Sequence, residues 1–173
     1  VINPCDDVEA RAAVKAAYEY VGPVYMRFGR LAVPVINDET TYKFEIGKGV
    51  ELRPGKDITI IATGLPVSES LEAAKFLAED GIDAQVINIH TIKPLDEELV
   101  VKAAQATGRV FTVEEHSIIG GLGSAVMECL AEKNPVKVTR IGVRDTFGES
   151  GPAKDLLHKY ELDAEGIYKQ IKA

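Results

Sequence analysis

Four titratable side chains that could bind a polar ligand or move a proton follow short apolar runs of the chain: His90, Glu114, His116 and Arg144. Histidine titrates near neutral pH and a carboxylate can orient its ring, so this set is a candidate for acid–base work. Polar side chains are also expected wherever a strand leaves an apolar core. The residues therefore indicate a crevice at strand ends, with ordinary strand-end polarity as the alternative.

A glycine-rich loop lies between one apolar run and the next helix pattern. Its residues Gly120, Gly121, Gly123 and Ser124 could present backbone N–H groups to an anion at a helix N-terminus. A dinucleotide-binding loop would need a third glycine where Val126 stands, and a phosphate loop would need a following lysine. A tight turn, a close helix–sheet contact or a subunit contact explains the glycines equally well.

Two arginines, Arg27 and Arg30, follow a short apolar run near the N-terminus. An arginine fork can bind a phosphate through two hydrogen bonds, although most surface arginines are only solvated. Ser150 lacks the spacing of a nucleophile elbow and is interpreted as a turn or cap residue. Cys5 and Cys129 lie in no disulfide or zinc pattern, so we expect no metal site.

These side chains need a scaffold, and the chain from 57 to 173 predicts a regular one. Apolar runs typical of buried strands alternate with amphipathic helix patterns. Because parallel strands need helical crossovers, this alternation predicts a three-layer α/β/α sandwich with a mostly parallel sheet. The expected strands are 58–62, 84–89, 109–113 and 136–141, and the expected helices are 68–80, 96–106, 123–132, 152–160 and 163–171.

The preceding residues predict an isolated helix and strand, and then a linker. A helix is expected over 6–21 and a strand over 24–28, which together form an α-β remnant, residues 1–30, that cannot bury both its faces alone. Residues 31–56 are rich in glycine and proline and are interpreted as a linker. Within it we expect a hairpin that pairs 42–46 with 50–53.

The composition excludes several classes of partner. The 173 residues carry 20 basic and 27 acidic side chains, a formal net charge of −7, with no basic cluster. Nucleic acid and membrane surfaces are therefore not expected partners. No apolar run approaches the roughly 20 residues needed to cross a bilayer, so we expect a cytoplasmic protein.

Three stretches resemble one enzyme family. Residues 58–94, the run TVEEHSIIGGLGS at 112–124 and the run DTFGESG at 145–151 resemble the C-terminal domain of the thiamine diphosphate-dependent transketolase family. The match is strongest to split transketolases, in which this region is a separate subunit. Related patterns occur in 1-deoxyxylulose-5-phosphate synthase and in 2-oxo acid dehydrogenase beta subunits. Residues 1–30 resemble the end of the pyrimidine-binding domain that precedes the C-terminal domain in this family.

The resemblance implies a reaction and a division of labour. The complete enzyme would transfer a two-carbon ketol unit between sugar phosphates with thiamine diphosphate and magnesium. The GDG motif that holds the diphosphate and metal is absent from the sequence, and the glutamate that acts on the aminopyrimidine ring would lie upstream. The resemblance therefore implies that this chain binds no coenzyme, is inactive alone, and needs an N-terminal diphosphate-binding subunit or domain.

The resemblance also implies a substrate residue and an assembly. The family's transketolases bind the sugar phosphate with an arginine in an RxxxP pattern, which Arg30 and Pro34 match, with Arg27 as the alternative. We expect dimer contacts and a wall near the active-site entrance. Two other classes of function stay open: a regulatory module that binds a small anion at 120–124, and a purely structural oligomerisation domain.

Overall fold

The computed structural model describes residues 1–173 and contains a five-stranded sheet in the order β1-β3-β2-β4-β5. Strand β1 is antiparallel to β3, and the other neighbouring strands are parallel. The strands are β1 (Val50–Arg53), β2 (Ile58–Ala62), β3 (Ala84–Asn88), β4 (Arg109–Ser117) and β5 (Lys137–Val143). The helices are α1 (Asp7–Glu19), α2 (Pro66–Glu79), α3 (Glu97–Thr107), α4 (Leu122–Lys133), α5 (Ala153–Lys159) and α6 (Ala164–Lys172).

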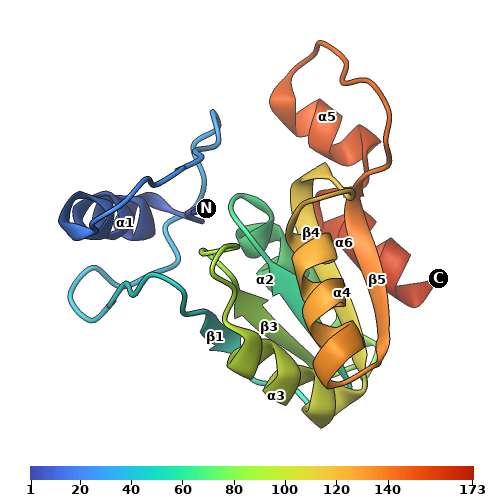
Figure 1. The fold of residues 1–173 in the computed structure, drawn as a ribbon. Coiled ribbons are helices and arrows are strands. Elements are labelled where there is room, and N and C mark those ends of the chain that lie inside the picture. Colours follow the sequence, from blue (N-terminus) through green and yellow to red (C-terminus); the bar gives the residue numbers. More distant parts are fainter.

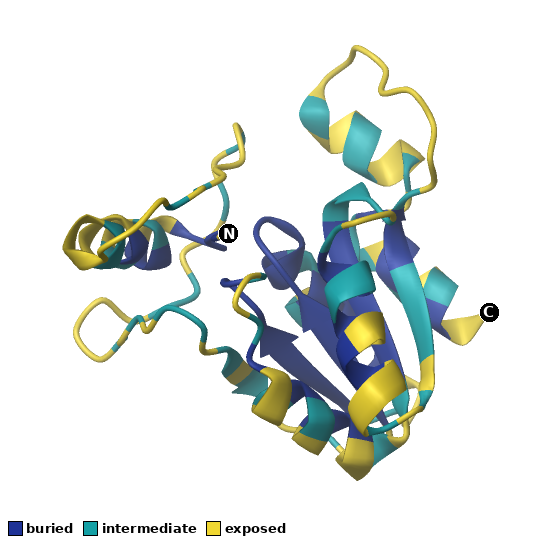
Figure 2. Ribbon diagram, in the orientation of Figure 1, coloured by how far each residue is buried: buried dark blue, intermediate teal, exposed yellow.

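Helices cover both faces of the sheet, which confirms the predicted three-layer sandwich (Figure 1). Apolar side chains of α2 and α6 pack on one face in a cluster of 16 buried residues. Those of α3 and α4 pack on the other face in a cluster of 11. Every residue of β2 and β3 is buried, as Figure 2 shows, because a parallel sheet covered on both sides has no solvent face.

Capping aspartates begin two of these helices, and a glycine ends one of them. Asp96 caps α3 by accepting a hydrogen bond from the Leu99 amide, and Asp163 caps α6 in the same way at Gly166. Gly108 ends α3 in the left-handed conformation, at φ 68°, which glycine adopts without steric cost. None of the helices is both long and apolar enough to cross a bilayer.

The predicted strand at 24–28 does not form. Only Met26 makes an isolated bridge, to Ile2, through the bonds Ile2 N–H to Tyr25 O and Arg27 N–H to Ile2 O. The apolar pattern was typical of a strand, but a strand needs a neighbour along its length. This segment has only residue 2 beside it.

The predicted hairpin at 42–53 is also wrong. Residues 42–46 form no strand, and β1 pairs instead with the edge of β3. Gly49 fixes this course, because its amide donates to Asp96 Oδ2 at 3.0 Å. Its Cα also packs so closely that a Cβ would lie 2.6 Å from Ile89 Cδ1. The sheet therefore begins inside the stretch interpreted as a linker.

A buried carboxylate holds α1 against the sheet. Glu9 is fully buried and accepts hydrogen bonds from the Cys5 amide at 2.7 Å, from Asn88 Nδ2 at 2.8 Å and from the Tyr42 hydroxyl. Burial raises the pKa of Glu9 above its usual value. The three donors come from three separate segments, so one side chain joins α1, the 38–49 region and β3.

Candidate functional site

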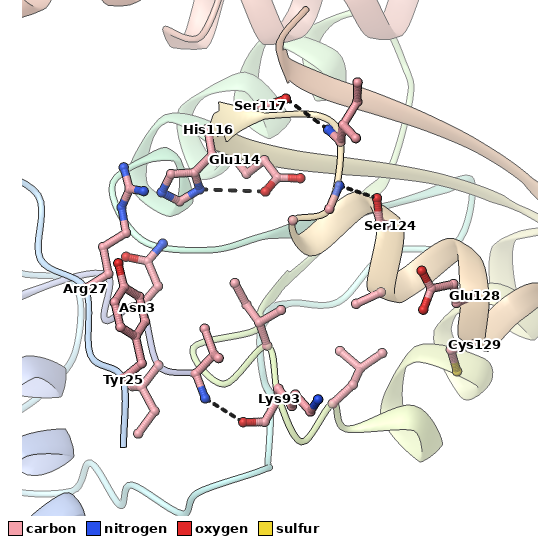
Figure 3. Close-up of a pocket in the computed structure, with 18 of the residues that line it drawn as sticks. Asn3, Tyr25, Arg27, Lys93, Glu114, His116, Ser117, Ser124, Glu128 and Cys129 are labelled. Atoms are coloured by element: carbon pink, nitrogen blue, oxygen red, sulfur yellow. Dashed lines mark hydrogen bonds and ion pairs between the residues drawn. The ribbon is translucent and has the colours of Figure 1, made fainter. Parts of the chain in front are cut away.

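A cleft of about 710 Å³ lies between the N-terminal segment, the segment after β3, the end of β4 and one side of α4. Figure 3 draws most of the side chains that line it and labels the polar ones discussed below. Parallel strands bring their carboxyl ends to one edge of the sheet, and ligands in α/β folds favour that edge. Two of the four predicted crevice residues, Glu114 and His116, line this cleft.

Glu114 is held by the N-terminus of α4. Its Oε2 accepts from the Leu122 amide and its Oε1 from the Gly123 amide, both at 2.9 Å. A carboxylate at this position satisfies free helix donors and complements the positive end of the helix dipole. The side chain is 1% exposed, so the carboxylate stabilises the helix start rather than facing a ligand.

His116 is the predicted residue that the cleft leaves available. Its Nδ1 lies 3.6 Å from Glu114 Oε2, which is too long for a hydrogen bond but within the range of an electrostatic contact. Its Nε2 is buried and has no hydrogen-bond partner. The imidazole thus has one nitrogen near a carboxylate and one without a partner.

The other two predicted crevice residues lie elsewhere, which corrects the expectation of a four-residue site. His90 is 1% exposed; its ring packs on Phe44 at 4.3 Å between centroids, and its Nδ1 is 2.9 Å from Thr91 Oγ1. Burial lowers the pKa of His90 from 6.5 to about 4. Arg144 is exposed beyond β5 and donates to Gln170 Oε1. His90 follows β3 and Arg144 follows β5, whereas Glu114 and His116 lie within the last residues of β4, so strand order and side-chain direction separate the four.

The glycine loop has internal acceptors for its amides. Besides the two donors that Glu114 takes, the Gly120 amide donates to Ser124 Oγ at 2.8 Å. A Cβ on Gly121 would lie 1.9 Å from Glu114 Oε2, and one on Gly123 would lie 2.7 Å from Arg140 Cγ. Close packing therefore accounts for these two glycines, while anion binding at the loop stays a prediction.

Arg30 lies outside this cleft, beside a second cavity of about 260 Å³. Its wall includes Leu156 and Leu157 of α5, Val143 at the end of β5 and Glu115 of β4. The guanidinium is exposed, and no group within the chain pairs with it. Arg27, in contrast, lines the first cleft and lies 3.8 Å from Glu115 Oε1.

The side chains do not assemble a metal centre. No three or more His, Cys, Asp or Glu side chains lie together as metal ligands. Both cysteines are free and buried. Burial raises the pKa of the Cys5 and Cys129 thiols, which makes both poor nucleophiles.

Asn3 also lines the cleft, and no motif or periodicity in the sequence points to it. It is placed there by the backbone bond from its own amide to His90 O and by the bridge at Ile2. Both contacts join residues far apart in the chain. A lone asparagine has no periodicity or motif from which such a position follows.

Comparisons with known proteins agree on one family. The profile described as "Transketolase, C-terminal domain" matches residues 47–167. The 6-deoxy-6-sulfo-D-fructose transketolase subunit SqwH of Clostridium sp. (strain MSTE9) is 47% identical over 169 residues, which cover 98% of this chain and 52% of the relative. The 1-deoxy-D-xylulose-5-phosphate synthase 1 of Geobacter sulfurreducens is 43% identical over 178 residues, covering 100% of this chain and 28% of the relative.

A solved structure agrees with the fold along the whole chain. It is described as a split gene transketolase, an inactive beta4 tetramer, and superposes with a TM-score of 0.95 at 47% identity. The match covers 99% of this chain and 56% of that one. The chain thus spans about half the length of the split transketolases that it matches.

Proposed function

This chain belongs to the transketolase C-terminal domain family, and we propose that it is the C-terminal part of an enzyme that transfers a two-carbon ketol unit between sugar phosphates. The similarity to a split transketolase subunit over 98% of the chain carries the proposal. A synthase relative is 43% identical over 100% of this chain, against 47% for the transketolase subunit over 98%, so sequence identity favours the transketolases by a small margin.

In this proposal the chemistry lies mainly on the partner. Thiamine diphosphate and magnesium are held by the N-terminal subunit or domain, and the coenzyme supplies the carbanion chemistry. This chain supplies assembly contacts, a wall near the active-site entrance, and Arg30 for the sugar phosphate. The exposed, unpaired guanidinium of Arg30 is free to bind a phosphate through two charge-assisted hydrogen bonds.

The N-terminal part of the chain carries the contact surface for that partner. Tyr18 and Val21 are 91% and 97% exposed, and Tyr25 and Phe28 are 64% and 55% exposed. Exposed apolar side chains clustered in one short segment mark an interaction site. We propose that they pack against the N-terminal half and that the assembled subunits form a homo-oligomer, the dimer being the simplest form.

The two free, buried cysteines suit a reducing compartment, and we place the enzyme in the cytoplasm. The second candidate function is that of a 1-deoxyxylulose-5-phosphate synthase, which the 43% identity to that relative favours. A 2-oxo acid dehydrogenase, a regulatory anion-binding module and a purely structural domain are further alternatives from the sequence.

Product analysis of the complete assembly with coenzyme and magnesium decides between these functions. Given a ketose phosphate donor and an aldose phosphate acceptor, a transketolase moves two carbons, and both the shortened donor and the lengthened acceptor appear. With pyruvate in place of the ketose phosphate donor and glyceraldehyde 3-phosphate as the acceptor, formation of 1-deoxyxylulose 5-phosphate with release of carbon dioxide would instead favour the synthase. Neither product, together with intact assembly, would exclude both enzymes.

A further inference from the structure

The cleft of about 710 Å³ between the N-terminal segment and α4 contains hydrogen-bond donors that the proposed reaction does not use. Figure 3 shows the carboxamide of Asn3, the guanidinium of Arg27 and the imidazole of His116 at the same end of this cleft. Asn3 is 2% exposed, and its Nδ2 has no hydrogen-bond partner. His116 Nε2 also lacks one. Native structures leave few buried polar atoms unpaired, so two in one cleft indicate a missing partner.

Arg27 adds a charged donor to this end. Its side chain is 44% exposed, and its nearest carboxylate oxygen, Glu115 Oε1, is 3.8 Å away. At that distance the two groups form an ion pair without a hydrogen bond, so the guanidinium N–H groups can still donate to a ligand. Glu114 does not repel an anion strongly here, because two backbone amides at the N-terminus of α4 take up its carboxylate.

The opposite end of the cleft is acidic. Glu128 and Glu132 are exposed on one face of α4, and Glu97 lies across from them but pairs with Lys133. Lys93 is the other cationic side chain in the wall. Figure 3 shows Glu128 well separated from the Arg27 end. At about 710 Å³ the cleft has the size of a metabolite site rather than that of a single ion.

We propose that this cleft binds a small elongated metabolite whose one end is an oxyanion, a carboxylate or a phosphate, and whose other end is an amine. Asn3, Arg27 and His116 bind the oxyanion, and Glu128 and Glu132 bind the amine. The site is separate from the phosphate contact at Arg30, which lines the other cavity. The side chains that bind the oxyanion face the glycine loop across the cleft, so this site differs from the anion site that the sequence predicted at the loop itself.

Histidine NMR on the intact protein tests the oxyanion end, because the chain has only 3 histidines. The signal of His116 is assigned with His116→Gln, and inorganic phosphate and acetate are the two head-group probes. We expect a saturable shift of the His116 signal with one or both, and no shift of the exposed His158. Arg27→Gln should weaken the binding about tenfold or more, which is the loss of one charge-assisted contact.

Arg144→Gln is the matched control, since it removes an exposed arginine outside the cleft and should leave the affinity unchanged. Asn3→Ala should also weaken binding. If that variant does not fold, the affinity of Arg27→Gln decides the test, because Arg27 is exposed. A His116 signal that neither probe moves, or that moves equally in Arg27→Gln, overturns the site.

The amine end is tested by comparing phosphoethanolamine with ethyl phosphate, which differ by the amine. We expect tighter binding of phosphoethanolamine, and loss of that advantage in Glu128→Gln combined with Glu132→Gln. Glu19→Gln, at an exposed carboxylate on α1, is the control. Equal affinities for the two probes in the wild type would overturn the assignment of the acidic end.

Discussion

At the scale of single residues, Arg30 and His90 show opposite relations to their surroundings. Arg30 is exposed and unpaired, so a ligand is its natural partner. His90 is buried and packs on Phe44, so it contributes to the core as a neutral side chain. Both are polar residues near strand-like segments, and the sequence alone could not separate a binding residue from a packed one.

Arg30→Ala should remove the phosphate contact in the complete enzyme. We expect kcat/KM to fall by the equivalent of roughly 1.5–3 kcal/mol for a phosphorylated aldehyde acceptor and to change little for an unphosphorylated one. Arg30→Lys should recover little, because an ammonium lacks the planar fork. Arg144→Ala is the control. Equal losses for both acceptors would assign Arg30 to the solvated surface.

His90 should make the fold sensitive to acid. Its pKa is about 4 in the folded chain and 6.5 as an unperturbed histidine, so the unfolded state binds the proton more readily between those values. The stabilisation is complete above pH 6.5 and is lost as pH falls towards 4, by on the order of 3 kcal/mol.

Urea unfolding of the wild type and of His90→Asn across this range isolates the effect, because groups common to both chains cancel. The variant should lose less stability on acidification. His158→Asn is the control. The His158 ring donates a hydrogen bond to the Asp163 carboxylate, which raises the pKa of His158, so His158 adds stability at low pH and its removal cannot reduce the loss of stability on acidification. Parallel curves for the wild type and His90→Asn would contradict this account.

At the scale of elements, the start of α4 depends on Glu114. Glu114→Ala leaves the buried amides of Leu122 and Gly123 without acceptors, at roughly 1–3 kcal/mol each. Glu114→Gln keeps one acceptor oxygen and should lose less. Ser124→Ala removes only the exposed bond from Gly120 and should cost about 1 kcal/mol or less. We expect the urea midpoint to be highest for Ser124→Ala, lower for Glu114→Gln and lowest for Glu114→Ala. Equal midpoints for Glu114→Ala and Ser124→Ala would contradict the role of Glu114 as a helix cap.

At the scale of the whole molecule, β1 decides where the C-terminal unit begins. A fragment of residues 47–173 keeps the pairing of β1 with β3, whereas 57–173 loses it. The longer fragment should be more stable by about 2 kcal/mol, since each backbone hydrogen bond contributes about 0.5–1.5 kcal/mol. Urea unfolding of both fragments measures the difference. Identical midpoints would restore residue 57 as the functional start of the domain.

Sequence patterns predicted the regular part of this molecule because periodicity reflects burial within one element. The alternation after residue 57 placed four strands and their helices correctly. Contacts between distant segments were out of reach. The pairing of β1 with β3, the donation from Asn88 to Glu9 and the separation of His90 from His116 depend on tertiary packing. Six residues that line the cleft were therefore singled out from the sequence, whereas Asn3 was missed; the six are Arg27, Glu114, His116, Gly120, Gly121 and Ser124.

Reconstitution tests the central claim most directly. An N-terminal half that includes both the diphosphate-binding domain and the pyrimidine-binding domain with its glutamate is loaded with thiamine diphosphate and magnesium and titrated with this chain, and ketol transfer between sugar phosphates is measured. We predict no transfer by either component alone and a rate that rises and saturates as this chain is added. Transfer by this chain alone, or a full rate from the N-terminal half without it, would contradict the proposed division of labour.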